Sequence, residues 1–475
     1  MHRLVGLLLT VTVGLVLADS AIVTLALPEM LQELDASVAQ VAWVLISYNL
    51  VLGALAVPAA LRRIRAHPRA LAAIGIAVFA GASAWCAAAP TIEVLIAARC
   101  VQALGGAFAL VGALELLVAR MGERRGVAAW VTAGVVGTAA GPVAGGLLTE
   151  AISWQAIFIA QVPFAALAVP AALLVREPVP GDGPVEEPDV AHRPVVGHNV
   201  TLGLLSAALT AALFLLVLLL VEGWRHSPAM AALTVSVIPV AALVAQPLAR
   251  WLQPPPDVEV AVGCLLVAGG LVGLALPPSA DLIWTVAPQA LVGLGLGLSV
   301  DQLTYRAMEG RRPRARHAAW TISSRHLGVV VGLAILTPVF TADLLDAEEP
   351  ATEAIASLVI DAPLQPDDKI ALARALGAEL TGQRGQVPEL SGAFASLDVA
   401  PEDRAAVDDL ERELDDQLDR AVSLAFRDSY LVGAGLALAA MVTVGVGSVV
   451  RTVRDRPRTP PPSGLPDLPG AEVAR

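Results

Sequence analysis

The sequence is poor in charge and in cysteine, and it lacks the motifs of nucleotide-driven or catalytic proteins. Charged residues make up only 16% of its 475 residues, whereas soluble proteins carry about 25%. Its three cysteines, Cys86, Cys100 and Cys264, lie in apolar runs without zinc-ligand spacing, so neither disulfides nor a metal site is expected. The sequence has no recognisable phosphate-binding loop or catalytic set of side chains. ATP, any other cofactor and enzymatic activity are therefore not expected.

Long apolar runs are what the sequence has instead. Hydrophobic residues make up 56% of the chain, and the mean hydropathy is +0.70. About 20 apolar residues in helical conformation cross the hydrocarbon core of a bilayer. We therefore predict an all-α membrane protein with twelve transmembrane helices. The predicted spans are 4–28, 41–61, 70–90, 94–119, 127–149, 154–175, 200–221, 228–250, 258–277, 282–304, 318–342 and 427–450.

Arginine-rich segments set the predicted orientation. They occupy 62–69, 120–125, 306–316 and the stretch after 451, which share one side when twelve spans are threaded. The positive-inside rule places that side, and with it both termini, in the cytoplasm. Lys369 is the only lysine, which is typical of a GC-rich genome. We predict a multi-pass protein of a bacterial plasma membrane.

The spans divide into two halves of six, 1–176 and 200–451. A cytoplasmic linker at 177–199 is rich in proline, and the tail at 452–475 is rich in proline and predicted to be disordered. Two six-helix halves are typical of transporters built from repeats, in which the substrate site lies where the halves meet.

An acidic insert at 346–425 separates spans eleven and twelve and is predicted to lie outside the cytoplasm. It holds 19 acidic and 6 basic residues. Residues 367–380 predict one amphipathic helix, and a second begins near Pro401. We expect a helical hairpin over the outer opening that acts as a cap, with binding of a partner or substrate as the alternative. Neither nucleic acid nor anionic lipid suits this charge. The apolar stripe of the second helix comprises Val407, Leu410, Leu414, Leu418 and Val422.

The stretch GVVGTAAGPVAGGLL at 134–148 carries glycines on one helix face. Gly134, Gly137, Gly141 and Gly145 recur at spacings of three and four. In a bilayer, such a face lets a neighbouring helix approach closely. Pro142 adds a bend.

The string GPVAGGLLTEAISWQAIFIAQVP resembles the antiporter motif in the fifth helix of the major facilitator superfamily. The version with Trp154 and Pro163 is similar to the drug:proton antiporter-2 group. LADSAIVTLALPEM, AWVLISYNL, RCVQALGG and SSRHLGVVVGLAI resemble further motifs of that group. The resemblance implies the major facilitator fold and proton-coupled export. It assigns antiporter-motif or gating roles to Gly134, Gly137, Gly141, Pro142, Gly145, Gly146 and Arg325.

The sequence departs from that group in several places. Many members have fourteen spans, and the loop at 62–69 has Ile64 about where the superfamily carries an Asp. Ala103 replaces a Gly, Gln155 an Arg and Gln161 an Asn. The missing Asp in the loop at 62–69 motivates the alternative of a transport-inactive sensor or accessory protein.

Two ionisable residues in the apolar spans are predicted to meet. At 1.5 Å per residue, Asp19 lies roughly 22 Å above the cytoplasmic side and Arg99 roughly 9 Å below the outer side. In a core of about 30 Å these depths nearly coincide. Protonation of Asp19 would free Arg99, which describes a proton switch. A static ion pair is the alternative; in the family, the matching acid and Arg are associated with proton coupling.

Other polar and aromatic residues complete the predicted sites. Arg325, about 10 Å deep in span eleven, needs a polar partner. Rings and amides that could line a substrate cavity are Trp43, Tyr48, Asn49, Gln102 and Phe108. Residues predicted to form a cytoplasmic gate are Arg62, Arg65, Arg69, Glu115 and Asp301.

The sequence thus predicts a secondary active transporter that exports small amphipathic or drug-like molecules by alternating access. Its expected partners are a small-molecule substrate, protons and the lipid bilayer, and it gives no indication of oligomeric state. An exporter of a lipid or cell-envelope precursor is an alternative with the same fold.

Overall fold

The computed structural model describes residues 2–61, 67–175, 193–309, 311, 313–382, 391–395 and 404–454. In these ranges the regular structure is helical, and twelve helical segments are long and apolar enough to cross a membrane. The prediction of twelve transmembrane helices is therefore confirmed.

The N-terminal half contains six spans. They are α1 (His2–Thr24), α3 (Val38–Ala59), α5 (Pro68–Ala87), α6 (Ile92–Met121), α7 (Glu123–Ala151), and α8 (Trp154–Ile159) followed by α9 (Gln161–Leu173). The short helix α2 (Leu27–Glu33) lies between the first two. Local chemistry fixes several starts: Ser37 and Gln40 form a capping box before α3, and Thr91 caps α6.

The C-terminal half supplies the other six. The seventh span runs through α10 (Val196–Thr210), the π-helical turn η1 (Ala211–Leu215), α11 (Leu216–Leu218) and η2 (Leu219–Gly223). The next spans are α12 (Pro228–Val235) with α13 (Val237–Leu252), α14 (Pro256–Ala275), α15 (Ile283–Met308), α16 (Arg314–Asp361) and α19 (Arg404–Arg454). Helix α10 begins inside the predicted linker, and α19 extends into the predicted tail. Residues 177–192 and 455–475 lie outside the described part of the chain.

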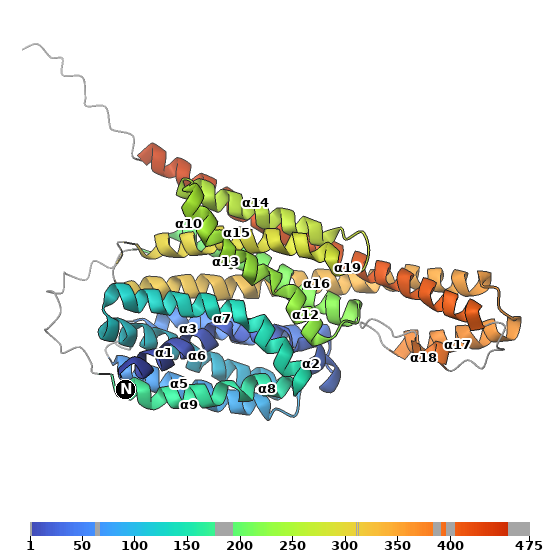
Figure 1. Ribbon diagram of the computed structural model, residues 1–475, viewed down its shortest axis with the longest axis horizontal. Coiled ribbons are helices and arrows are strands. Elements are labelled where there is room, and N and C mark those ends of the chain that lie inside the picture. The colour runs from blue at the N-terminus through green and yellow to red at the C-terminus, as the bar shows by residue number, and fades with distance from the viewer. Residues whose placement is uncertain are drawn as a thin grey trace, which may run out of the picture.

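The two halves lie one above the other with their helices roughly along the long axis (Figure 1). They meet where α16 packs on α3 and where α12 packs on α7. Within the N-terminal half, the glycine face of α7 lies directly on α1. A Cβ on Gly137 would lie 2.3 Å from the Gly14 carbonyl oxygen, and one on Gly145 would lie 2.3 Å from that of Ile22. The predicted close approach therefore occurs, and its partner is α1 of the same half.

The acidic insert forms a small helical unit of its own. Helix α16 continues unbroken to Asp361, which the sequence analysis does not predict, and α17 (Pro366–Gly382) and α18 (Ser391–Ala395) follow. The expected apolar stripe of α19 is buried. Figure 1 shows the unit continuing the bundle lengthwise rather than lying across its end, so the expected cover over the outer opening is not seen. The insert side chains buried with that stripe include Ile355, Val359, Leu372, Leu376 and Phe394.

Candidate functional site

Asp19 and Arg99 meet inside the N-terminal half, as the estimate of their depths predicts. Asp19 lies on α1 and Arg99 on α6, and both side chains are 0% exposed. The Arg99 Nη1 donates to the Asp19 Oδ2. Because an isolated charge is costly in an apolar interior, each group depends on the other for a partner.

Two amides complete the shell of this ion pair. Gln102 accepts from Arg99 Nη1 at 2.6 Å and donates to Asp19 Oδ1 at 3.2 Å and to Ser83 Oγ at 2.9 Å. Gln161, on α9, donates to the same Asp19 oxygen at 3.0 Å. The residue that departs from the family motif therefore contacts Asp19 directly. From the sequence, Gln161 stands out only as a substitution in the family motif. An amide in the same apolar segments as an ionisable residue was the signal that could have identified it.

Aromatic rings enclose the guanidinium of Arg99. Its central carbon lies 4.1 Å from the ring centroid of Tyr48 and 5.7 Å from that of Phe158, distances suited to cation–π attraction. Tyr48 also donates to the Val16 carbonyl at 2.8 Å. Tyr48 and Gln102 thus surround the ion pair, and neither lines the two cavities between the halves, which corrects their predicted role.

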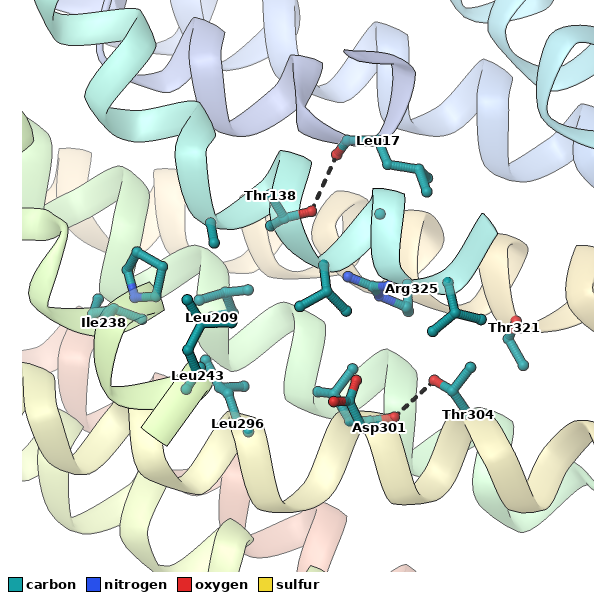
Figure 2. Close-up of a pocket in the computed structure, with 18 of the residues that line it drawn as sticks. Leu17, Thr138, Leu209, Ile238, Leu243, Leu296, Asp301, Thr304, Thr321 and Arg325 are labelled. Atoms are coloured by element: carbon teal, nitrogen blue, oxygen red, sulfur yellow. Dashed lines mark hydrogen bonds between the residues drawn. The ribbon is translucent and has the colours of Figure 1, made fainter. Parts of the chain in front are cut away.

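A central cavity lies between the two halves. It holds about 1190 Å³ of empty space, including its opening to solvent, and its walls come from α1, α7, the seventh span, α13, α15 and α16. Most of its lining is apolar (Figure 2). Two ionisable side chains from the sequence analysis, Asp301 and Arg325, lie in its walls. Asp301 was expected at a cytoplasmic gate, so its place in the central cavity corrects that prediction.

A second hollow of about 690 Å³ adjoins this cavity. Arg325 and His326 line both, and Asn49 lines the second, as predicted for a cavity residue. Trp43 and Phe108 line neither. Trp43 is 51% exposed at the surface, and Phe108 packs in the core of the N-terminal half, so both predictions are corrected.

Polar contacts join the halves beside the second hollow. His326 Nδ1, on α16, lies 2.6 Å from Asn49 Oδ1 on α3. The Asn49 amide donates at 3.1 Å to Ser20 Oγ, next to Asp19 on α1. A chain of contacts therefore links the cavity wall of the C-terminal half to the helix that carries Asp19. His326 could not be predicted as a contact residue from the sequence, because a single His in an apolar span forms no spacing pattern.

Contacts at the arginine-rich end of the bundle also cross the halves. Arg314 Nη1, at the start of α16, lies 2.7 Å from Glu123 Oε1, at the start of α7. Among the predicted gate residues, Arg69 starts α5 and Glu115 is half-buried in α6. Arg62 and Arg65 lie outside the described residues.

Some antiporter-motif residues line the central cavity, and others contact a helix of the other half. Gly134 and Pro142 line the central cavity. Further along α7, a Cβ on Gly146 would lie 2.3 Å from Ala232 Cβ on α12 of the other half. Glu150 Oε2 accepts from the Ala229 backbone N–H at 2.6 Å. The motif therefore ends in a contact between the halves, on the far side of the cavity from the arginine-rich end.

Two six-helix halves around a largely apolar cavity define a membrane transporter, and comparison with known proteins gives the family. The chain belongs to the Major Facilitator Superfamily, whose sequence profile matches residues 9–333. Among solved structures, it resembles a bacterial homologue of the human lysosomal transporter Spinster in an inward-facing, occupied conformation. That alignment has a TM-score of 0.60 and 16% identity over 96% of this chain and 98% of the other. A D-xylose–proton symporter aligns with a TM-score of 0.53 and 16% identity over 70% and 88%.

Curated relatives are resistance and efflux proteins. The chain is 29% identical over 243 residues, 49% of each protein, to the Methylenomycin A resistance protein of Bacillus subtilis. It is 36% identical over 173 residues to the Tetracenomycin C resistance and export protein of Streptomyces glaucescens, covering 35% of this chain and 32% of that one. It is 33% identical over 159 residues to the Multidrug efflux pump LfrA of Mycolicibacterium smegmatis, covering 33% and 32%. The matches span about half or less of these relatives.

Proposed function

We propose that this protein is a proton-coupled exporter of small amphipathic molecules that works by alternating access. It would act in a bacterial plasma membrane with both termini in the cytoplasm. The observation that carries the proposal is the fully buried Asp19–Arg99 ion pair on the helix that also lines the cavity. Membership of a transporter family and the efflux function named for the relatives support the direction of transport.

The ion pair has the chemistry of a proton switch. While Asp19 is ionised, its charge holds Arg99 and, through both amides, ties α1 to α6 and α9. Protonation would remove that charge and leave Arg99 with neutral partners, Gln102 and the Tyr48 ring. Because Leu17 and Ser20 flank Asp19 on α1 and line the cavities, a shift of α1 would reach the substrate.

The contacts between the halves support alternating access. The contact of Gly146 and Glu150 with α12 lies on the far side of the cavity from the arginine-rich end. Cavity residues Trp130, Gln246 and Thr304 lie toward that arginine-rich end. If that end is cytoplasmic, the arrangement corresponds to a state closed toward the outside and hollow toward the inside.

Proteoliposomes with an imposed pH gradient test the coupling. Ethidium is the transport probe, and an internal pH dye reports proton movement. We expect Asp19→Asn to abolish uphill ethidium transport, while the protein still elutes as a single species, because Asn keeps the shape and an acceptor oxygen. Glu93→Gln, an exposed acid on α6, is the matched control and should transport normally. Uphill transport by Asp19→Asn at the wild-type rate would refute the proton switch.

The same vesicles separate the alternatives. A transport-inactive sensor would move neither ethidium nor protons. A lipid exporter would move a fluorescent phospholipid across the vesicle membrane in response to the gradient but not ethidium. Either result would contradict the proposal.

A further inference from the structure

Two opposite charges face each other across the central cavity. Arg325 lies on α16 and Asp301 on α15, and Figure 2 shows them on facing walls. The apolar side chains of Leu209, Leu243 and Leu296 line the same cavity to one side of the two charges. The cavity therefore offers one cation and one anion on facing walls, with apolar space beside them.

The two charges act on each other electrostatically, but neither is held by a hydrogen bond or a close ion pair. In the part of the chain that the structure describes, no hydrogen bond or salt bridge reaches the Arg325 guanidinium or the Asp301 carboxylate. The neighbouring Arg306 differs, since its Nη1 lies 2.5 Å from Asp257 Oδ1. A guanidinium offers five N–H donors and a carboxylate about four acceptor sites, so both groups keep their full bonding capacity for a ligand.

We propose that Arg325 and Asp301 bind opposite ends of an amphoteric amphipathic molecule, one that carries an anionic group and a cationic or hydrogen-bond-donating group on an apolar body. The anionic group would bind Arg325 through charge-assisted hydrogen bonds. The donor end would bind Asp301. A purely cationic ligand would leave Arg325 unpaired, and a purely anionic ligand would leave Asp301 unpaired, so neither satisfies both walls. The role of this molecule as cargo rests on the proposed function, whereas its binding does not.

Two dyes with one apolar body test the proposal. Rhodamine B is a zwitterion with a carboxylate and a delocalised cation, and its ethyl ester keeps the cation without the carboxylate. Fluorescence polarisation on the purified full chain in detergent, without a pH gradient, gives both affinities. We expect rhodamine B to bind wild type about tenfold more tightly than the ester, a typical effect for a charge-assisted pair. Measurements on the wild-type protein alone can overturn the proposal. Either equal affinities for the two dyes or no binding of rhodamine B would do so.

Variants then test which side chain binds the carboxylate of the dye and which binds its cation. Arg325→Gln should remove the preference for rhodamine B, and Arg325→Lys should keep part of it. Asp301→Asn should weaken both dyes equally, because both carry the cation. Arg306→Gln is the matched control and should change neither affinity, because Arg306 is paired with Asp257 and lies outside the cavity lining. A preference retained in Arg325→Gln would overturn the assignment.

The two proposals fail in different ways. A dye preference that follows Arg325, together with no uphill transport of either ethidium or rhodamine B, would contradict the proton-coupled function alone. Uphill ethidium transport together with equal binding of both dyes would contradict the amphoteric site alone.

Discussion

At the scale of single residues, the Asp19 carboxylate has an unusually complete shell for a group inside a membrane span. Arg99 and Gln102 reach it from α6, and Gln161 reaches it from α9. Because every donor comes from another helix, the ionisation state of one side chain bears on the packing of three helices. In the proposed function, protonation of Asp19 would therefore change the packing of these helices.

Gln161 offers a test of this shell. Gln161→Leu keeps a similar volume but removes a donor to Asp19, so we expect a loss of about 1–3 kcal/mol in the free energy of unfolding. Thermal unfolding of the detergent-solubilised protein measures the change. Gln155→Leu, in the same segment but near the surface, should cost less than about 0.5 kcal/mol. Equal losses in the two variants would show that the Gln161–Asp19 contact is not specially stabilising.

Glu29, on α2 outside the spans, gives a pH-dependent prediction. Burial, and then the charge of Glu33, raise the pKa of the Glu29 carboxyl above its ordinary value. A raised pKa means that the ionised form opposes folding, so the penalty is absent below the ordinary pKa and grows as the pH rises toward neutral.

We therefore expect Glu29→Gln to raise the free energy of unfolding at pH 7 by less than about 1 kcal/mol, because the group lies near the surface. At pH 4 the gain should shrink, because the native carboxyl is then largely protonated. Glu353→Gln, an exposed acid, is the control and should give no gain at either pH. A gain that is larger at pH 4 than at pH 7 would contradict the sign of the shift.

At the scale of the element, α7 packs against two different helices through two different faces. Gly137 and Gly145 lie on α1 of the same half, so this face holds the half together. Gly146 lies on α12 of the other half, and that contact must open if the halves move. The sequence pattern identified the glycines because their spacing is visible. It could not separate the faces, because neighbouring positions on one helix differ only in which helix lies opposite.

Gly146→Val should therefore hold the halves apart at the end opposite the arginine-rich loops. Its new Cβ would lie 2.3 Å from Ala232 Cβ, too close to be accommodated without separation. Spin labels or cysteine pairs across α7 and α12 should report a longer distance, and uphill transport should fall at least tenfold. Gly81→Val, where a Cβ would meet no atom within 4 Å, is the control and should behave as wild type. Wild-type distances and rates in Gly146→Val would show that this contact does not control cycling.

At the scale of the whole molecule, patterns that depend on one helix at a time predicted much of the structure. Apolar length predicted the twelve spans, and helical rise brought Asp19 and Arg99 together. Rotation of each helix about its axis was not predictable, because it depends on which neighbours pack against it. Hence Tyr48 and Gln102 were expected in the cavity and surround Arg99 instead, whereas Asp301 was expected at a gate and lies in the cavity wall.

The insert supplies a test at this largest scale. Its base contacts the bundle through Trp224 Nε1 and Ser423 Oγ at 3.2 Å and through Arg225 Nη1 and Asp415 Oδ1 at 3.6 Å. Below it, Phe340 of α16 and Phe426 of α19 lie side by side, 4.4 Å between ring centroids. Helices α17 and α18 pack on α16, α19 and each other, so the twelve spans should fold without most of the insert.

Removing 350–420 and joining the ends through a short Gly-Ser linker should therefore leave a monodisperse protein. Its unfolding temperature should stay within a few degrees of wild type. Removing only 350–398 should cause aggregation, because it deletes Ile355 and Leu372 and exposes Leu410 and Leu414, which they help to bury. Size-exclusion chromatography distinguishes the two. Aggregation of both deletions would mean that the bundle depends on the insert, and a monodisperse shorter deletion would mean that another surface covers the stripe.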